Sequence, residues 1–260
     1  MKDKRNNTIL KEKVKNYIPT IITAILILVC WEFIVRAFSI SKWILPGPIR
    51  IFIAFYQQRV LLFQHSLRTF YEAVIGLTLS SLTGLLIGGI IFHFKILRKT
   101  LYPFLVISQT VPIVVLVPLL VIWLGYGITP KLVIVILACF FPVAVNTVDG
   151  LAAADREKIQ LLCSMGASRW QIFKLIRIPS ALPMIMSGLR IAATYAVMAA
   201  VVAEWMGSDM GLGVYIVRSS NSYLTERVFG GIILVSFLSI MFFQFVNLLE
   251  KKIIYWKNDK

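Results

Sequence analysis

Few residues in this chain could carry out acid–base, nucleophilic or metal chemistry. His65 and His93 are the two histidines, and the motifs H-E-x-x-H, G-x-S-x-G and G-x-x-x-x-G-K are all missing. Without a glycine-rich phosphate loop the chain cannot cradle ATP, so it is not an ATPase by itself. Cys30, Cys139 and Cys163 have neither the even count nor the spacing of a disulfide set. We therefore expect no enzyme activity and no cofactor or metal bound by this chain.

Glu204 is the acidic residue whose position most suggests a functional role. It ends a long apolar stretch and precedes the glycine-rich segment Gly211-Leu212-Gly213. A carboxylate at the end of a membrane span is costly unless it is paired or hydrated. Two interpretations stay open: Glu204 contacts a solute, or it pairs or caps within the loop.

The composition is typical of a multi-spanning helical membrane protein. Hydrophobic residues make up 58% of the chain, charged residues 15%, and the mean hydropathy is +0.82. The net charge of +15 fits the excess of Lys and Arg that membrane proteins place on the cytoplasmic side. No basic stripe alternates with aromatic residues, so we expect a lipid bilayer as partner and no nucleic acid.

Apolar runs of about 20 residues predict an all-α, polytopic fold with about six transmembrane helices. The predicted spans are Ile18–Phe38, Ala73–Phe94, Leu101–Leu124, Leu132–Val148, Pro183–Trp205 and Val228–Leu249. The first run lacks a small-residue cleavage signal, so we interpret it as a retained span and not as a signal peptide.

The distribution of cations predicts the orientation. With the N-terminus inside, 18 of the 27 Lys and Arg residues fall on one side of the membrane and seven on the other. This places both termini and the central loop in the cytoplasm of a cell-membrane protein. The expected organisation is a basic tail over residues 1–17, a transmembrane domain over 18–249 with a cytoplasmic loop over 149–182, and a second tail over 250–260.

Two spans carry small residues at four-residue spacing, which lets another helix approach closely. Span two has Gly76, Ser80, Gly84 and Gly88, and span five has Gly188, Ala192, Ala196 and Ala200. The spacing does not say whether these faces pack within one subunit or between two.

Span three contains Pro103, Pro112 and Pro118, each of which removes a backbone donor, so we expect a bent or locally broken helix. The freed carbonyls could line a transport pathway, or the prolines could have a purely structural role. Asn146 is either a hydrogen-bond partner of another helix or a polar group on the pathway. The candidate pathway or gate residues are Pro112, Pro118, Asn146, Ala196, Glu204, Gly211 and Gly213.

Local patterns predict further features near the outer surface. Charges four residues apart predict the ion pairs Glu32–Arg36 and Arg68–Glu72, with a contact to the solute as the alternative for Glu32 and Arg36. After Pro48, apolar residues recur with a helical period through Phe63. This pattern predicts an amphipathic helix lying in the outer membrane interface.

The central loop is the one long polar, cationic interruption among the spans. Two short helical patterns meet at Gly166, one running back to Ala152 and the other starting at the N-cap residue Ser168 and stopping before Pro179. Apolar side chains on this loop, with the cationic Arg169, could dock in a groove of a soluble partner.

The loop resembles the cytoplasmic coupling motif of ABC-importer permeases, which runs Glu-Ala-Ala, three residues, Gly, and then Pro thirteen residues later. Gly166-Ala167-Ser168, Phe173 and Pro179 match, whereas Gln160-Leu161-Leu162 stands in place of Glu-Ala-Ala. The resemblance covers most of the chain, from Leu45-Pro46-Gly47-Pro48 to Gly211-Leu212-Gly213, and is greatest to the nitrate, sulfonate and taurine branch.

This resemblance implies a type I importer fold and a transport subunit that works with other chains. Implied partners are a second permease copy in a homodimer, two cytoplasmic ATPases that use ATP and Mg, and an extracytoplasmic solute-binding protein. The implied ATPase-coupling residues are Gln160, Leu162, Gly166, Ala167, Ser168, Arg169, Phe173 and Pro179.

The substrate stays open at this point. The segments Ala203-Glu204-Trp205 and Gly211-Leu212-Gly213 are similar to those of permeases for the thiamine-precursor pyrimidine, and sulfonate, taurine and nitrate are the alternatives. Two other classes are also open. An energy-coupling-factor scaffold also uses coupling helices, and a secondary transporter would need inverted repeats, which the sequence does not display.

Overall fold

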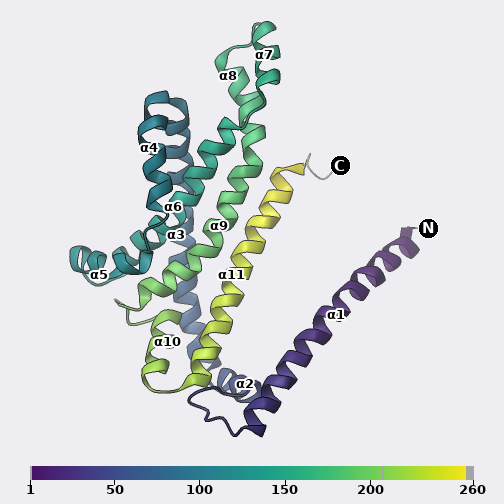
Figure 1. Cartoon of the computed structure of the whole chain (residues 1–260), viewed down its shortest axis with the longest axis vertical. Helices are drawn as coiled ribbons and strands as arrows, with labels where there is room; N and C mark the ends of the chain where they lie inside the picture. The colour runs from purple at the N-terminus through teal and green to yellow at the C-terminus, as the bar shows by residue number, and fades with distance from the viewer. Residues whose placement is uncertain (1, 207, 256–260) are drawn as a thin grey trace. The chain divides into compact units, whose positions relative to one another are not determined.

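A computed structural model describes residues 2–206 and 208–255, and within these ranges the chain is helical with no strand (Figure 1). The predicted all-α class is confirmed. The chain divides into two units, Met1–Arg59 with Arg218–Gly230, and Val60–Val217 with Gly231–Lys260. Residues 256–260 of the predicted C-terminal tail lie outside the described residues.

The first unit contains α1 (Lys2–Ala37) and α2 (Pro48–Gln57), together with the end of α10 (Leu212–Asn221) and the start of α11 (Thr225–Ile253). The rings of Trp31 and Phe229 lie 5.5 Å apart, and the Thr225 hydroxyl donates to the Trp43 carbonyl at 2.6 Å. These contacts fix α1 and the loop after it against the start of α11.

The amphipathic helix after Pro48 is shorter than predicted. It begins at Pro48, where a proline needs no amide partner, but it ends at Gln57. The Arg59 guanidinium donates to the Tyr56 carbonyl at 3.0 Å and so provides a hydrogen-bond donor for one of the last carbonyls of this helix. The apolar residues from Val60 to Phe63 belong instead to the next helix, so the extension through Phe63 was wrong.

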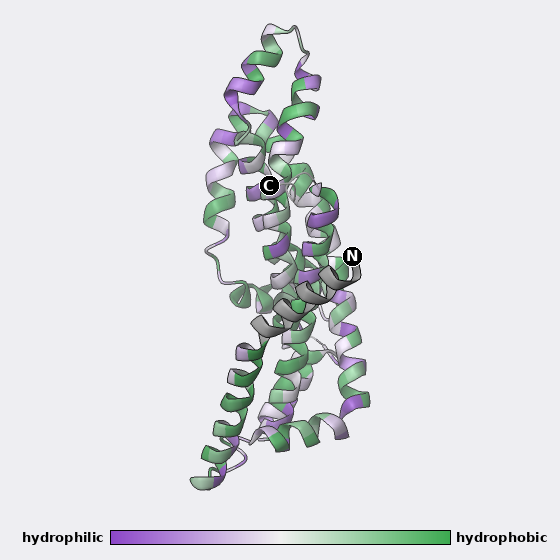
Figure 2. Cartoon of the chain, turned by 90° about the vertical axis from the view of Figure 1, so that its right-hand side faces the viewer, coloured by the Kyte–Doolittle hydropathy of each residue, from purple (hydrophilic) through white to green (hydrophobic). Residues whose placement is uncertain are grey.

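The second unit consists of long helices, several of which pack against α6 (Ile128–Ala152). They are α3 (Arg59–His93), α4 (Lys95–Ser108), α5 (Ile113–Leu124), α9 (Ile178–Glu204) and most of α11, joined by the short α7 (Arg156–Ser164), α8 (Arg169–Ile172) and a π-helix (Phe173–Arg177). Hydrophobic residues predominate along the long helices (Figure 2). Five helices in the described ranges are long and apolar enough to span a membrane, or six if one bent pair counts as a span.

That bent pair is the broken helix expected from the prolines. The axes of α4 and α5 differ by 99°, and Pro112 is the residue that precedes α5. Its missing amide and extended backbone separate the two halves, whereas Pro103 and Pro118 are accommodated inside helices. Only one of the three prolines therefore lies at the break.

The small-residue stripe of α3 packs within the subunit, against α6. A Cβ atom added at Gly76 would lie 2.3 Å from Val135 Cγ1, and one added at Gly84 would lie 2.9 Å from Val143. Ser80 and Gly88 are buried on the same face. Side chains larger than these would force α3 and α6 apart.

The second stripe, on α9, packs against the same helix. A Cβ atom at Gly188 would lie 2.7 Å from Asn146 Cβ, and Ala192, Ala196 and Ala200 are completely buried. Among the described residues Asn146 forms no hydrogen bond with another helix, and its side-chain amide donates to the Pro142 carbonyl of α6 itself at 2.8 Å. Of the two interpretations of Asn146, the interhelical hydrogen bond was therefore wrong, and the side chain bonds to its own helix where α9 approaches most closely.

Candidate functional site

The helical loop of α7 and α8 protrudes beyond α6 and α9 at the top of Figure 1. Residues 153–155 separate α6 from α7, so the first helical pattern begins at Arg156 and does not run back to Ala152. Asp155 caps α7 by accepting the Glu157 amide at 2.9 Å. This hydrogen bond to the charged form lowers the pKa of Asp155 below its ordinary range.

Gly166 ends α7 with a Schellman motif. Its amide donates to the Cys163 carbonyl at 3.0 Å, and the Ala167 amide donates to Leu162 at 2.9 Å. The φ angle of Gly166 is +80°, which side-chain-bearing residues rarely adopt. Apart from its neighbours in the chain, no atom of the described residues lies within 4 Å of the position that a Gly166 Cβ would take, so the space above this turn is open.

Ser168 starts α8 with a complete capping box. Its hydroxyl accepts the Gln171 amide at 3.3 Å, and the Gln171 side chain accepts the Ser168 amide at 2.7 Å. Gly166-Ala167-Ser168 is thus a helix stop followed directly by a helix start. This local chemistry gives the loop a defined shape.

The second helical half does not stop before Pro179, contrary to prediction. From Phe173 the chain forms a π-helix in which the Ile178 amide donates to the Phe173 carbonyl, and α9 then continues through Pro179. In a π-turn each amide donates to the carbonyl five residues earlier instead of four. This shift in the hydrogen-bond pattern lets the helix accommodate Pro179, which has no amide to donate. From Arg169 to Glu204, α8, the π-helix and α9 therefore form one continuous helical stretch.

Apolar side chains of the loop point away from the bundle. Leu161, Met165, Trp170 and Leu175 are 62%, 73%, 68% and 62% exposed. Trp170 stacks on Phe173 with ring centroids 5.8 Å apart, which orients the indole. Of the predicted coupling residues, Gln160, Gly166, Ser168 and Arg169 are exposed, and Leu162, Ala167 and Phe173 are half-buried.

The base of this loop is attached to two other helices. The Arg177 guanidinium donates to the Leu151 carbonyl at the end of α6, at 3.1 Å, and lies over the Phe92 ring of α3 at 5.0 Å. A force applied to α7 and α8 would therefore reach α3, α6 and α9 together.

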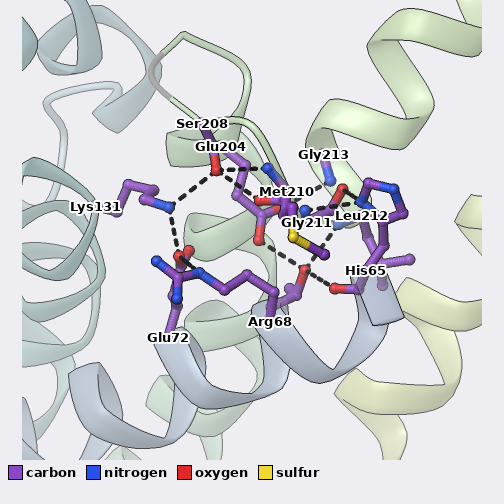
Figure 3. Close-up of polar contacts among 11 residues, drawn as sticks. His65, Arg68, Glu72, Lys131, Glu204, Ser208, Met210, Gly211, Leu212 and Gly213 are labelled. Carbon is purple, nitrogen blue, oxygen red and sulfur yellow. Dashed lines mark hydrogen bonds and ion pairs between the residues drawn. The ribbon is translucent and has the colours of Figure 1, made fainter. Parts of the chain in front are cut away.

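A polar network lies at the opposite end of α9 (Figure 3). The Glu204 carboxylate is completely buried, accepts the Thr69 hydroxyl at 2.7 Å and accepts the Gly213 amide at 2.6 Å. The Leu212 amide donates to Thr69 Oγ1 at 2.9 Å. Glu204 and Thr69 together satisfy the first amides of α10, which agrees with the capping interpretation of Glu204.

Gly211 and Gly213 are required by the close approach of other atoms. A Cβ at Gly211, whose φ is +133°, would lie 2.1 Å from the Glu204 carboxyl carbon, and one at Gly213 would lie 2.1 Å from the Val201 carbonyl. His65 Nδ1 lies 2.9 Å from the Gly211 nitrogen and 2.8 Å from its oxygen. The buried imidazole thus contacts this backbone directly.

A buried charge cluster adjoins the network. The Glu72 carboxylate, completely buried, accepts from Arg68 at 3.0 Å and from Lys131 of α6, whose ammonium also donates to Ser208 at 3.0 Å (Figure 3). The Arg68–Glu72 pair was predicted from spacing. So was the Glu32–Arg36 pair, in which Arg36 Nε lies 2.6 Å from Glu32 Oε1. Lys131 was missed, because no local pattern relates positions 59 residues apart.

Two pockets in the second unit lie near the candidate pathway residues. One, of about 690 Å³, opens beside Arg68, Lys131, Tyr126 and Trp205. The other, of about 370 Å³, lies at the α4–α5 break and has no charged residue among its described lining. Its lining residues are Ser108, Gln109, Val111, Ile113, Leu116, Leu137, Ala138, Phe141, Pro142 and Tyr195. Pro112, Pro118, Asn146 and Ala196 line neither pocket.

Fold and site together define a multi-pass helical membrane protein with one broken span and a protruding helix–glycine–helix loop. The described residues contain no cluster of three or more His, Cys, Asp or Glu that could hold a metal. The chain belongs to the family of binding-protein-dependent transport system inner membrane components, whose model matches residues 76–255. It is accordingly a permease subunit of an ABC importer.

Relatives of this chain are permease proteins of several transport systems. The formylaminopyrimidine transport permease protein ThiX of Halalkalibacterium halodurans is 35% identical over 237 residues, 91% of this chain and 94% of the relative. A putative aliphatic sulfonates transport permease protein of Bacillus subtilis is 32% identical and covers 93% of this chain and 87% of the relative.

Solved structures share the fold at low sequence identity. The MetNI methionine ABC transporter in inward-facing conformations has a chain that is 17% identical, with a TM-score of 0.60 over 76% of this chain and 97% of that chain. A chain of an amino acid ABC transporter crystallised with histidines, also 17% identical, has a TM-score of 0.64 over 77% of this chain and 98% of that chain. The type I importer permease fold is confirmed.

Proposed function

We propose that this chain forms the membrane pathway for a neutral pyrimidine of the formylaminopyrimidine kind. The observation that carries the proposal is the 35% identity to the Halalkalibacterium halodurans permease, which extends over nearly all of both chains. In this proposal two copies form the pathway, and an extracytoplasmic binding protein delivers the solute. Two cytoplasmic ATPases use ATP and Mg, and this chain binds no cofactor itself.

The pocket at the α4–α5 break supports a neutral solute. Phe141 and Tyr195 offer aromatic surface, and Ser108 and Gln109 offer hydrogen-bonding groups. A pyrimidine with amino groups needs both kinds of contact and no counter-charge. A sulfonate leaving water would need a cation beside it.

An aliphatic sulfonate is the second candidate, favoured by the 32% identity to the Bacillus subtilis permease. The larger pocket does contain Arg68 and Lys131, but both already pair with Glu72. The pyrimidine therefore suits the pocket linings better than the sulfonate does.

Uptake by the reconstituted transporter tests the substrate. Proteoliposomes containing this chain, its ATPase and its binding protein should accumulate labelled formylaminopyrimidine, with competition by the unlabelled pyrimidine and none by ethanesulfonate. Gln109→Leu should reduce uptake, whereas the neighbouring Thr110→Val, outside the pocket, should not. Uptake of sulfonate with no uptake of pyrimidine would refute the assignment.

The α7–α8 loop is the proposed contact with the ATPase. Its exposed Leu161, Met165 and Trp170 supply an apolar surface, and the open space above Gly166 permits close approach of another protein. The loop and both termini face the cytoplasm in this proposal, as the cation distribution predicts. Closure of the ATPases would move α9 and, through Arg177, α3 and α6.

Two substitutions at one position test this coupling. Gly166→Arg should abolish solute-stimulated ATP hydrolysis while the protein stays in the membrane, because it strains the turn and fills the open space. Gly166→Asn should retain most of the activity, since asparagine tolerates this backbone conformation. Normal uptake by the arginine variant would rule out the coupling role without affecting the substrate assignment.

A further inference from the structure

A cationic pocket of about 380 Å³ lies in the first unit, between the end of α1 and the start of α2. Its lining carries three cations, Arg36, Lys42 and Arg50, and one acid, Glu32. The remaining lining is small or apolar, from Val35, Ser39, Ile40, Leu45, Pro46, Gly47 and Ile49. The permease function proposed above makes no use of this pocket.

The acid in this pocket is already neutralised. Glu32 accepts the Arg36 guanidinium at 2.6 Å and the Ile49 amide at 3.2 Å. Lys42 and Arg50, in contrast, form no ion pair or side-chain hydrogen bond with any residue in the described ranges. Two unpaired cations therefore face one pocket, which attracts an anion.

An apolar groove adjoins the cationic pocket and shares Leu45 with it. The groove has a volume of about 450 Å³ and runs along α1 past Leu26, Ile27, Cys30, Trp31 and Ile34 to Leu45. Its one hydroxyl, on Thr23, donates to the Pro19 carbonyl at 2.9 Å and needs no further partner. From Thr23 to Ile34 the groove extends about 16 Å, close to the half-thickness of a bilayer's hydrocarbon core.

Exposed aromatic side chains lie in the two segments that carry Lys42 and Arg50, one directly after Lys42 and two on α2. Trp43, Phe52 and Tyr56 are 63%, 71% and 61% exposed. Tryptophan and tyrosine concentrate at the boundary between lipid tails and head groups, and an amphipathic helix such as α2 lies in the same plane. The pocket is therefore at the depth of the lipid phosphates, and the groove is at the depth of their acyl chains.

We infer that this pocket and groove bind an anionic phospholipid, with its phosphate at Lys42 and Arg50 and one acyl chain along α1. A free phosphate would use the pocket and leave the groove without a role. An acidic protein surface would likewise not occupy a groove lined by Leu26, Ile27 and Ile34. A diacyl lipid with a charged phosphate matches both surfaces at once.

Native mass spectrometry of the full-length chain in neutral detergent, titrated with phosphatidylglycerol, tests this inference. We expect phosphatidylglycerol to be retained in preference to phosphatidylcholine. Lys42→Gln and Arg50→Gln should each weaken its binding about fivefold, the equivalent of about 1 kcal/mol per cation. The matched control Lys95→Gln/Lys99→Gln removes two exposed cations from α4 and should leave binding unchanged.

A second pair of variants tests the groove. Leu26→Trp fills the groove and should reduce lipid binding, whereas Val29→Trp, on α1 but outside the groove lining, should not. Equal losses in the α4 control would overturn the inference by showing non-specific charge attraction. It would also be overturned if inorganic phosphate displaced the lipid while Leu26→Trp had no effect. A third contrary result is that the Lys42 and Arg50 variants weaken only the binding-protein interaction.

Discussion

Replacing Lys131 by methionine would leave the Glu72 carboxylate buried without its ammonium partner. The side chains of Lys131 and Glu72 are 3% and 0% exposed, so the Glu72 carboxylate depends on protein partners and not on water in the wild type. Arg68 still donates to Glu72, but its side chain is 42% exposed and its charge is screened by solvent. The second carboxylate oxygen of Glu72 has no partner among the described residues, so nothing else compensates.

Breaking a buried ion pair from one side typically costs about 3–5 kcal/mol. Because Arg68 remains, we expect the lower end for Lys131→Met, about 3 kcal/mol in the free energy of unfolding. Replacing both partners with apolar residues of similar volume is often neutral or stabilising. The double variant Glu72→Met/Lys131→Met should therefore return to within about 1 kcal/mol of the wild type.

The measurement is unfolding of the purified chain in mixed micelles by titration with dodecyl sulfate. The matched control is Arg68→Met, which removes the exposed partner of the same carboxylate and should cost no more than about 1 kcal/mol. A double variant as unstable as Lys131→Met alone would refute the reasoning. It would mean that the loss comes from packing, or from the Ser208 contact, and not from an uncompensated charge.

Three further predictions follow from the local geometry. Gly211→Ala should lower the free energy of unfolding by about 1–3 kcal/mol, because the added Cβ would collide with Glu204 and the φ angle is positive. Gly89→Ala, with open space around the added Cβ, should be neutral or stabilise α3 by about 0.5–1 kcal/mol. Both variants are measured in the same dodecyl sulfate titration. Ser168→Ala should remove about 1 kcal/mol from α8 and accelerate hydrogen exchange of its amides. The lowered pKa of Asp155 means that its cap is complete at neutral pH. As the pH falls through that lowered pKa the cap is lost, so protection of the α7 amides should weaken only at a pH below the ordinary pKa of aspartate, and Asp155→Asn should abolish this dependence.

Features set by neighbours along the chain could be predicted from the sequence. The turn at Gly166, the cap at Ser168 and the pairs Glu32–Arg36 and Arg68–Glu72 each depend on residues within one helical turn or cap. Apolar runs of sufficient length likewise indicate membrane spans whatever their neighbours are.

Features set by contacts between distant segments could not be predicted from the sequence. The end of α2 at Gln57 depends on where the chain must turn into α3, and a periodic apolar pattern continues across that turn. The hydrogen bond of Asn146 depends on how closely Gly188 brings α9 to α6. The passage of the helix through Pro179 depends on a π-turn that no residue type encodes by itself.

The sequence by itself thus determined the class of the protein, the existence of its spans, a break in the third of them, and the turn at Gly166 with the cap at Ser168. The tertiary structure alone decided that both small-residue stripes pack on α6. It also decided that Glu204 and Thr69 cap α10, and that Lys131 completes the buried charge cluster. The physical reason is that hydropathy and capping act over a few residues, whereas burial of a charge or a glycine depends on which helix faces it.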